Sequence, residues 1–166
     1  MSVTPFPTAR RIPIEDPAEI AEMERTLSAA AGLVAARGGL AALGGRELLA
    51  MSPGARAVLL TDMYDAGEVI FGWREAEDAR ARNVSIERLS VSVAGREPRA
   101  GWRAEFYREA PDEGGHRLEG AVVAGALSGI ATRLIDAVND PARIPDSGSG
   151  AALAAFAAAS GATGES

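Results

Sequence analysis

One short segment combines residue types that bind anions and transfer protons. Gly114 and Gly115 are followed by His116 and Arg117, where a polar connector enters a predicted helix. Free backbone N–H groups and the dipole at a helix start attract a phosphate or a carboxylate, and both side chains can add positive charge. The imidazole of His116 is also a candidate general acid or base. The alternative interpretation is a glycine turn with two solvated side chains.

Three carboxylates form a second candidate group. Asp62, Asp65 and Glu68 are spaced three residues apart, so a helix continuing through Gly67 would place them on one face. Such a face offers hard oxygen ligands for Mg²⁺ or Ca²⁺, or an acid/base pair. A strand beginning at Glu68 would separate the group, and a solvated helix end explains the same residues. We therefore predict no metal site and no cofactor.

Four aromatic residues form the third group. Trp73, Trp102, Phe106 and Tyr107 fall in the part of the chain that we expect to form a sheet. Aromatic side chains line many ligand pockets, although they fill hydrophobic cores more often. The ligand-binding residues that we predict combine two of these aromatics with the glycine turn: Trp73, Trp102, His116 and Arg117.

The residue types that are missing exclude several chemistries. All seventeen basic residues are arginines, there is no lysine, cysteine or glutamine, and His116 is the single histidine. A chain without lysine cannot form a lysine Schiff base, and one without cysteine has no thiolate nucleophile or iron–sulfur cluster. One histidine cannot build a multi-histidine metal site. The remaining possibilities are carboxylate, hydroxyl, tyrosine and arginine chemistry, or no catalysis.

Two helix starts are marked by a capping residue followed by proline. Asp16 precedes Pro17, and an apolar residue then recurs every three or four positions to about Arg37. Ser52 and Pro53 open a second helix through about residue 66 in the same way. Between these helices, residues 40–51 predict a short helical piece interrupted by glycines.

The middle of the chain predicts strands. Residues 68–73 fit either a helix or a strand, and we favour a strand. Residues 84–93 and 99–107 alternate apolar and polar side chains on either side of a glycine loop, which predicts an antiparallel hairpin. The apolar phase changes between Ile86 and Leu89, so we expect a bulge near Glu87. Arginines and carboxylates interleave through residues 75–109, which is typical of a solvated face of mixed charge.

A long helix is predicted over residues 117–139, ending before Pro141. Small residues recur along it and would allow another backbone to approach closely, either the sheet of this chain or a second subunit. A further apolar pair lies near the C-terminal end of the chain. The predicted interface residues are Gly120, Ala121, Ala124, Gly125, Ser128, Gly129, Leu153 and Phe156.

The two ends of the chain differ from its middle. Residues 1–15 are rich in proline and predict an extended arm. Residues 16–143 form the predicted single domain, and residues 144–166 are a Ser/Gly/Ala-rich segment that predicts a flexible tail. A short helix around Leu153 and Phe156, docked on a partner or on the domain itself, is the alternative.

Charge and hydropathy limit the partners. The formal net charge is -6 with a pI near 4.9, which disfavours nucleic acid and anionic membranes. A helical DNA reader over residues 17–66 is a weaker alternative, because carboxylates outnumber arginines there. The most apolar stretch, residues 29–43, contains Arg37 and falls short of the roughly twenty residues of a membrane span. We expect a soluble, cytoplasmic protein.

These observations predict an α+β fold. It has N-terminal helices, a small antiparallel sheet of two or three strands, and a long C-terminal helix packed on the sheet. The expected function is that of a non-catalytic interaction protein, such as an accessory subunit, adaptor or assembly chaperone, that binds a protein partner or itself. The alternative is a small-molecule-binding domain, or an enzyme that uses carboxylate, tyrosine and arginine side chains, with its site near residues 111–120.

Overall fold

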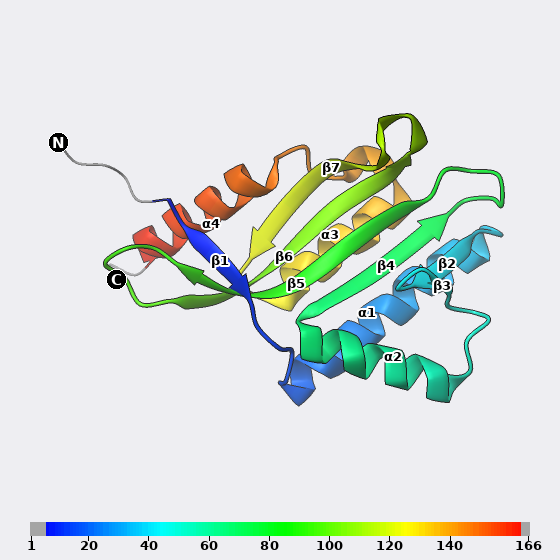
Figure 1. Ribbon diagram of the computed structural model, residues 1–166, viewed down its shortest axis with the longest axis horizontal. Helices are drawn as coiled ribbons and strands as arrows, with labels where there is room; N and C mark the ends of the chain where they lie inside the picture. Colours follow the sequence, from blue (N-terminus) through cyan, green and yellow to red (C-terminus); the bar gives the residue numbers. More distant parts are fainter. Residues whose placement is uncertain (1–5, 164–166) are drawn as a thin grey trace.

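The computed structural model describes the backbone of residues 6–163 and the side chains of residues 6–159. This part of the chain has an α+β fold, with four α-helices and a seven-stranded antiparallel sheet (Figure 1). The strands are β1 (Thr8–Arg11), β2 (Leu40–Leu43), β3 (Arg46–Glu47), β4 (Glu68–Arg74), β5 (Arg82–Ser92), β6 (Arg99–Ala110) and β7 (Gly115–Ala124). The helices are α1 (Pro17–Ala36), α2 (Pro53–Ala66), α3 (Leu127–Asn139) and α4 (Ser149–Thr163). The prediction of N-terminal helices followed by a two- or three-stranded sheet is therefore wrong, because β1 precedes α1, and β2 and β3 lie between α1 and α2.

The strands follow the order β3-β2-β4-β5-β6-β7, and β1 also pairs with β5. β4 pairs with residues 82–87 of β5, while β1 pairs with residues 89–92 farther along the same edge. β1 thus continues the line of β4, and the N-terminal arm becomes part of the sheet. β5 and β6 pair over nearly their whole lengths and form the centre of the fold.

Both helix starts marked by proline are confirmed. The Asp16 carboxylate accepts a hydrogen bond from the backbone N–H of Ala18 at 2.9 Å, and the Ser52 hydroxyl accepts one from Ala55 at 3.2 Å. These caps satisfy N–H groups that the first turn of a helix leaves free. α2 ends at Gly67, whose φ of +74° is a left-handed conformation that glycine adopts without strain.

Residues 40–51 do not form the predicted helical piece. They form the hairpin β2–β3, joined by Gly44 and Gly45, which both have positive φ angles (57° and 81°). Two consecutive left-handed residues make the tight turn that matches the twist of an antiparallel hairpin. The apolar side chains of Ala41 and Leu43 then enter the core from β2, which lies between β3 and β4 in the sheet.

The predicted helix over residues 117–139 is also wrong in its first half. Residues 115–124 form β7, and α3 begins at Leu127. Helical spacing from Val123 through Leu127 and Ile130 suggests continuity across the Gly125–Ala126 junction, where the chain in fact changes structure. Pairing along most of β6 provides β7 with backbone hydrogen bonds that local spacing does not reveal.

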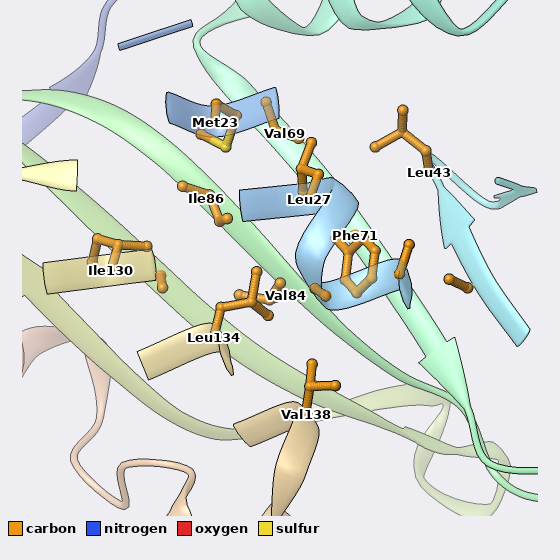
Figure 2. Packing of buried hydrophobic residues seen from close by; sticks show 14 of the residues in the cluster. Met23, Leu27, Leu43, Val69, Phe71, Val84, Ile86, Ile130, Leu134 and Val138 are labelled. Atoms are coloured by element: carbon orange, nitrogen blue, oxygen red, sulfur yellow. The ribbon is translucent and has the colours of Figure 1, made fainter. Parts of the chain in front are cut away.

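The main core lies between the sheet and the pair α1 and α3. Side chains from both helices face alternate residues of β4 and β5 (Figure 2). Trp102 and Phe106 of β6 are fully buried in the same cluster. The core residues labelled in Figure 2 are Met23, Leu27, Leu43, Val69, Phe71, Val84, Ile86, Ile130, Leu134 and Val138.

The hairpin β5–β6 is confirmed, but the predicted bulge near Glu87 is absent. The register between these strands runs without interruption from Arg82 opposite Arg108 to Val91 opposite Arg99. The apolar phase of β5 changes because a different layer covers each part. Val84 and Ile86 face the main core, whereas Leu89 and Val91 point to the other side of the sheet and pack against α4.

Candidate ligand-binding site

The sheet face opposite to α1 and α3 is hollowed where α4 does not cover it. We call this hollow the trough. It has a volume of about 760 Å³, and its lining includes Leu40, Ile70, Ser85, Glu105, Tyr107 and His116. β2 contributes apolar surface, β4 contributes Ile70 together with the charged Glu68 and Arg74, and β5 and β6 contribute polar side chains. Hollows of this size accommodate small organic ligands.

A buried ion pair lies beside the trough on the same face. Glu87 of β5 is only 4% exposed, and Arg103 on β6 is its cross-strand neighbour. The guanidinium donates two hydrogen bonds to the two carboxylate oxygens of Glu87, at 2.8 and 3.1 Å. This hydrogen bonding, together with the charge of Glu87, raises the pKa of Arg103 despite its partial burial.

The N-terminal strand adds a second arginine to this network. Arg11 of β1 approaches Glu87, with Nε 3.3 Å from Oε2, and also donates from Nη1 to Glu68 at 3.1 Å. The other oxygen of Glu68 accepts a hydrogen bond from the Ser85 hydroxyl at 2.5 Å. Glu68 and Ser85 both line the trough, so the network connects directly to its surface.

Glu105 connects the trough to α4. Its carboxylate accepts a hydrogen bond from the hydroxyl of Ser149, the first residue of α4, and lies 3.8 Å from Arg103 Nε. Tyr107 follows two residues later on the same strand face. Burial raises the pKa of Tyr107, and the negative charges of Glu105 and Glu87 raise it further, so the phenol remains a neutral hydrogen-bond donor at physiological pH.

Buried charged networks add little to stability by comparison with apolar packing. Removing charges from water carries a large penalty, and well-packed apolar residues often stabilise a fold equally well. The pair of Glu87 and Arg103, with Arg11 beside it, is therefore not explained by stability alone.

The structure separates the four predicted ligand-binding residues. His116 and Trp73 are among the residues that line the trough. The Trp73 ring packs against Phe71, with centroids 5.9 Å apart, and the side chain belongs to the core. Arg117 is exposed, and its Nη1 atom lies 3.5 Å from Oε1 of Glu113, a residue of the connection between β6 and β7.

Trp102 lies in the main core with the Arg88 guanidinium over its ring, 5.0 Å from the centroid. Its indole N–H donates to Glu19 of α1 at 3.2 Å. These contacts anchor the helix layer to the sheet. Trp102 therefore packs in the core and does not line the trough.

The carboxylates predicted as a group are separated as well. Asp62 and Asp65 belong to α2, whereas Glu68 is the first residue of β4 and faces Arg11 and Ser85. Within the described part of the chain, no group of three or more His, Cys, Asp or Glu side chains is arranged to hold a metal ion.

The predicted interface residues do not share a helix face. Gly120, Ala121 and Ala124 lie in β7, Gly125 lies in the turn after it, and Ser128 and Gly129 lie in α3. A close backbone approach does occur at Gly120, where a Cβ atom would lie 1.4 Å from the carbonyl oxygen of Pro145. The approaching backbone is the chain's own segment between α3 and α4. A role of these residues in an interface stays a prediction.

Leu153 and Phe156 pack within the chain. They form a second apolar cluster with Leu89 and Val91 of β5. The Phe156 ring also lies over Gly101, where a Cβ atom would be 3.2 Å from its Cζ atom. α4 thus covers the part of the sheet face that the trough does not occupy.

The network of Arg11, Glu68, Ser85, Glu87 and Arg103 was missed in the sequence. Arg11 was assigned to the arm, Glu87 and Arg103 to a solvated face of mixed charge, and Glu68 to the carboxylate group. Glu87 is instead buried, as is Ser85. One signal was present in the alternation of the strands. On β6, Arg103 and Glu105 lie on the sheet face opposite to Trp102 and Phe106. On β5, Ser85 and Glu87 lie on the same face as Arg103 and Glu105. The contribution of β1 depends on long-range pairing and has no local signal.

Comparisons with protein-family models, with curated proteins and with solved structures found no match. Among the residues that the structure describes, no helix is both long enough and apolar enough to cross a membrane.

Proposed function

We propose that this protein is a small-molecule-binding domain whose ligand occupies the trough. The observation that carries the proposal is the combination of a hollow of about 760 Å³ with a buried network of charges at its side. Leu40 and Ile70 supply apolar surface, and Ser85, Glu105 and Tyr107 supply polar groups. Small-molecule sites typically combine an apolar lining with a few polar groups that fix the orientation of the ligand.

The rigidity of the sheet supports binding at this position. Ser85, Glu105 and Tyr107 project from β5 and β6, which pair continuously over ten residue positions. Hydrogen bonds from Ser85 to Glu68 and from Ser149 to Glu105 restrain the two carboxylates before a ligand arrives. Groups that are already oriented lose less entropy on binding, which favours affinity.

The test is a matched pair of substitutions at Gly72, which lines the trough on β4. A Cβ atom there would lie 3.5 Å from the Arg82 carbonyl and 3.8 Å from the side chains of Ala42 and Asn83, so Gly72→Ala fits. Gly72→Trp would place an indole in the hollow. In a thermal-shift screen of small molecules, we expect ligands that stabilise the wild type to stabilise Gly72→Ala equally and Gly72→Trp much less.

Circular dichroism and thermal melting without ligand establish that both variants are folded. Ligands that stabilise Gly72→Trp as strongly as the wild type would place the binding site elsewhere on the molecule. A broad screen without any stabilising compound would contradict the proposal itself.

A non-catalytic interaction protein is the second candidate, and one observation favours it. Leu49, in the segment before α2, and Val58, within α2, are 63% and 65% exposed. Large apolar side chains at this exposure are typical of surfaces that a partner covers when they occur together. Light scattering tests self-association: the interaction proposal expects a dimer or larger species that Val58→Glu converts to a monomer, and a monomeric wild type contradicts it.

A further inference from the structure

We infer that the ligand of the trough is an organic cation: an amine attached to an apolar body. This inference rests on the proposed small-molecule function and adds the chemical class of the ligand. Four observations carry it: the charge of the lining, the partners of its arginines, the free acceptor capacity of its carboxylates, and the distance between Glu105 and the apolar side chains of Leu40 and Ile70.

The lining carries more negative than positive charge. Four glutamates line the trough, and two arginines, Arg74 and Arg82, oppose them, so the formal charge is -2 when His116 is neutral. The chain as a whole is also negative, at -6. A cation is therefore attracted to the trough and an anion is repelled. The four lining glutamates are Glu47, Glu68, Glu77 and Glu105.

Both lining arginines are already engaged by groups of the protein. Arg82 Nε donates to Glu119 at 3.0 Å, and Arg74 Nη1 donates to the backbone carbonyl of Glu77 at 3.0 Å. The guanidiniums that neutralise the buried network, those of Arg11 and Arg103, are not part of the lining. Arg82 is thus paired with a carboxylate that is outside the lining, which offsets its charge, although each guanidinium keeps unused N–H donors.

The carboxylates keep acceptor capacity. A carboxylate has about four lone-pair sites. Glu105 accepts from Ser149 and lies 3.8 Å from Arg103, while Glu68 accepts from Arg11 and Ser85. Glu105 is also hydrogen-bonded by Tyr107, and each of the two carboxylates still has fewer partners than lone-pair sites. An ammonium group offers three donors and no acceptor, so it complements this surface.

The sheet register places Glu105 two strands away from Ile70, although β4 also carries Glu68 and Arg74 on this face. Ile70 lies opposite Ser85, which lies opposite Glu105, and Gly72 leads in the same way through Asn83 to Tyr107. Two strand spacings separate β4 from β6, which is about 10 Å. A ligand with its ammonium near Glu105 would rest its apolar body on Ile70 and Leu40.

Three probes with one body and different head groups test the inference on the full chain: 4-phenylbutylamine, 4-phenylbutanol and 4-phenylbutyrate. Isothermal titration calorimetry at low ionic strength is expected to give a dissociation constant for the amine at least about tenfold below that of the carboxylate, with the alcohol between them. Equal or tighter binding of 4-phenylbutyrate would overturn the inference.

Substitutions locate the charge effect. Glu105→Gln is expected to weaken the amine about tenfold and leave the alcohol unchanged, because only the amine carries charge. Glu77→Gln keeps the test valid if Glu105→Gln disturbs the fold, since Glu77 is exposed and offers Arg74 its backbone carbonyl rather than its side chain. Glu97→Gln, an equal change of charge in the β5–β6 loop, is the control and is expected to have little effect.

The outcomes separate this inference from the proposed function. If amine and alcohol bind equally and Gly72→Trp abolishes both, the trough binds ligands but does not select cations. If Glu105→Gln and Glu77→Gln leave the affinity for the amine unchanged, cation selection in the trough is likewise wrong. If none of the three probes binds at low-millimolar concentration, both the inference and the proposed function are contradicted.

Discussion

Ser149 donates a hydrogen bond to Glu105, and this contact joins the first residue of α4 to a carboxylate that lines the trough. The helix that covers one part of the sheet face is thereby connected to the lining of the other part. Farther along α4, Leu153 and Phe156 pack on Leu89 and Val91. The position of α4 and the orientation of Glu105 therefore depend on each other.

Phe156→Ala tests how firmly α4 is docked. The ring packs over Gly101 and against the Leu89 cluster, so its loss is expected to lower the free energy of unfolding by about 2 kcal/mol. The substitution should accelerate hydrogen exchange more in α4 than in α3, because it weakens the docking of α4 and leaves the main core intact. Ala158→Ser, at an exposed position of the same helix, is the control. Equal acceleration in α3 and α4 would contradict a separately docked helix.

Arg103→Met tests the buried ion pair. The substitution leaves the Glu87 carboxylate buried with Arg11 as its remaining ion-pair partner, at 3.3 Å, and is expected to lower the free energy of unfolding by about 3 kcal/mol. Combining it with Glu87→Gln removes the uncompensated charge, so the double variant should lose less than the sum of the single losses. Urea unfolding measures all three variants, with the exposed Arg96→Met as control. Additive losses would show that the two side chains are not coupled.

Local signals in the sequence predicted the elements that local chemistry determines. Asp16 with Pro17 and Ser52 with Pro53 marked α1 and α2 correctly, because a capping side chain and proline act within a single turn. The strand at residues 68–73 and the β5–β6 hairpin were also confirmed. In these strands, the alternation of apolar and polar side chains reflects burial on one face.

The wrong predictions share a dependence on distant partners. β7 was taken for a helix because Val123, Leu127 and Ile130 happen to follow helical spacing, while its pairing with β6 lies outside any local window. The hairpin β2–β3 pairs with β4 about thirty residues away along the chain. For the trough, the sequence indicated His116 and Trp73, but the network around Glu87 requires the register of three strands.

Two glycine substitutions should have opposite effects. Gly67→Ala is expected to destabilise the protein by about 2 kcal/mol or more, because φ is +74° and the new Cβ would lie 2.3 Å from the carbonyl oxygen of Ile12. Gly32→Ala lies within α1 with no atom within 4 Å of the new Cβ, so it should stabilise the helix by up to about 1 kcal/mol. Thermal unfolding compares the two variants. A neutral Gly67→Ala would contradict the tight passage of the N-terminal arm against α2.

Alkaline pH should destabilise the protein chiefly through Tyr64. Its side chain is buried, its hydroxyl has no hydrogen-bond partner among the described residues, and burial raises its pKa well above the usual value, with the charge of Glu24 adding to the effect. The unfolded chain ionises its tyrosines near pH 10, whereas folded Tyr64 keeps its proton, so the unfolded state binds fewer protons above that pH. The free energy of unfolding is therefore unaffected by Tyr64 below about pH 10. Above that pH it falls by up to about 1.4 kcal/mol per pH unit for one tyrosine.

Few other side chains of this protein titrate in the pH range of tyrosine. The chain has two tyrosines and no lysine or cysteine, so Tyr64 and Tyr107 dominate proton release from the unfolded chain between about pH 9.5 and 12. Urea unfolding from pH 9 to 11.5, with tyrosinate absorbance followed in parallel, should show a falling free energy of unfolding in the wild type. Tyr64→Phe should remove most of that slope, and Tyr107→Phe a smaller part, because Tyr107 is less buried. A slope that is unchanged in Tyr64→Phe would mean that Tyr64 ionises equally in the folded and unfolded states, and thus that its hydroxyl reaches water in the native protein.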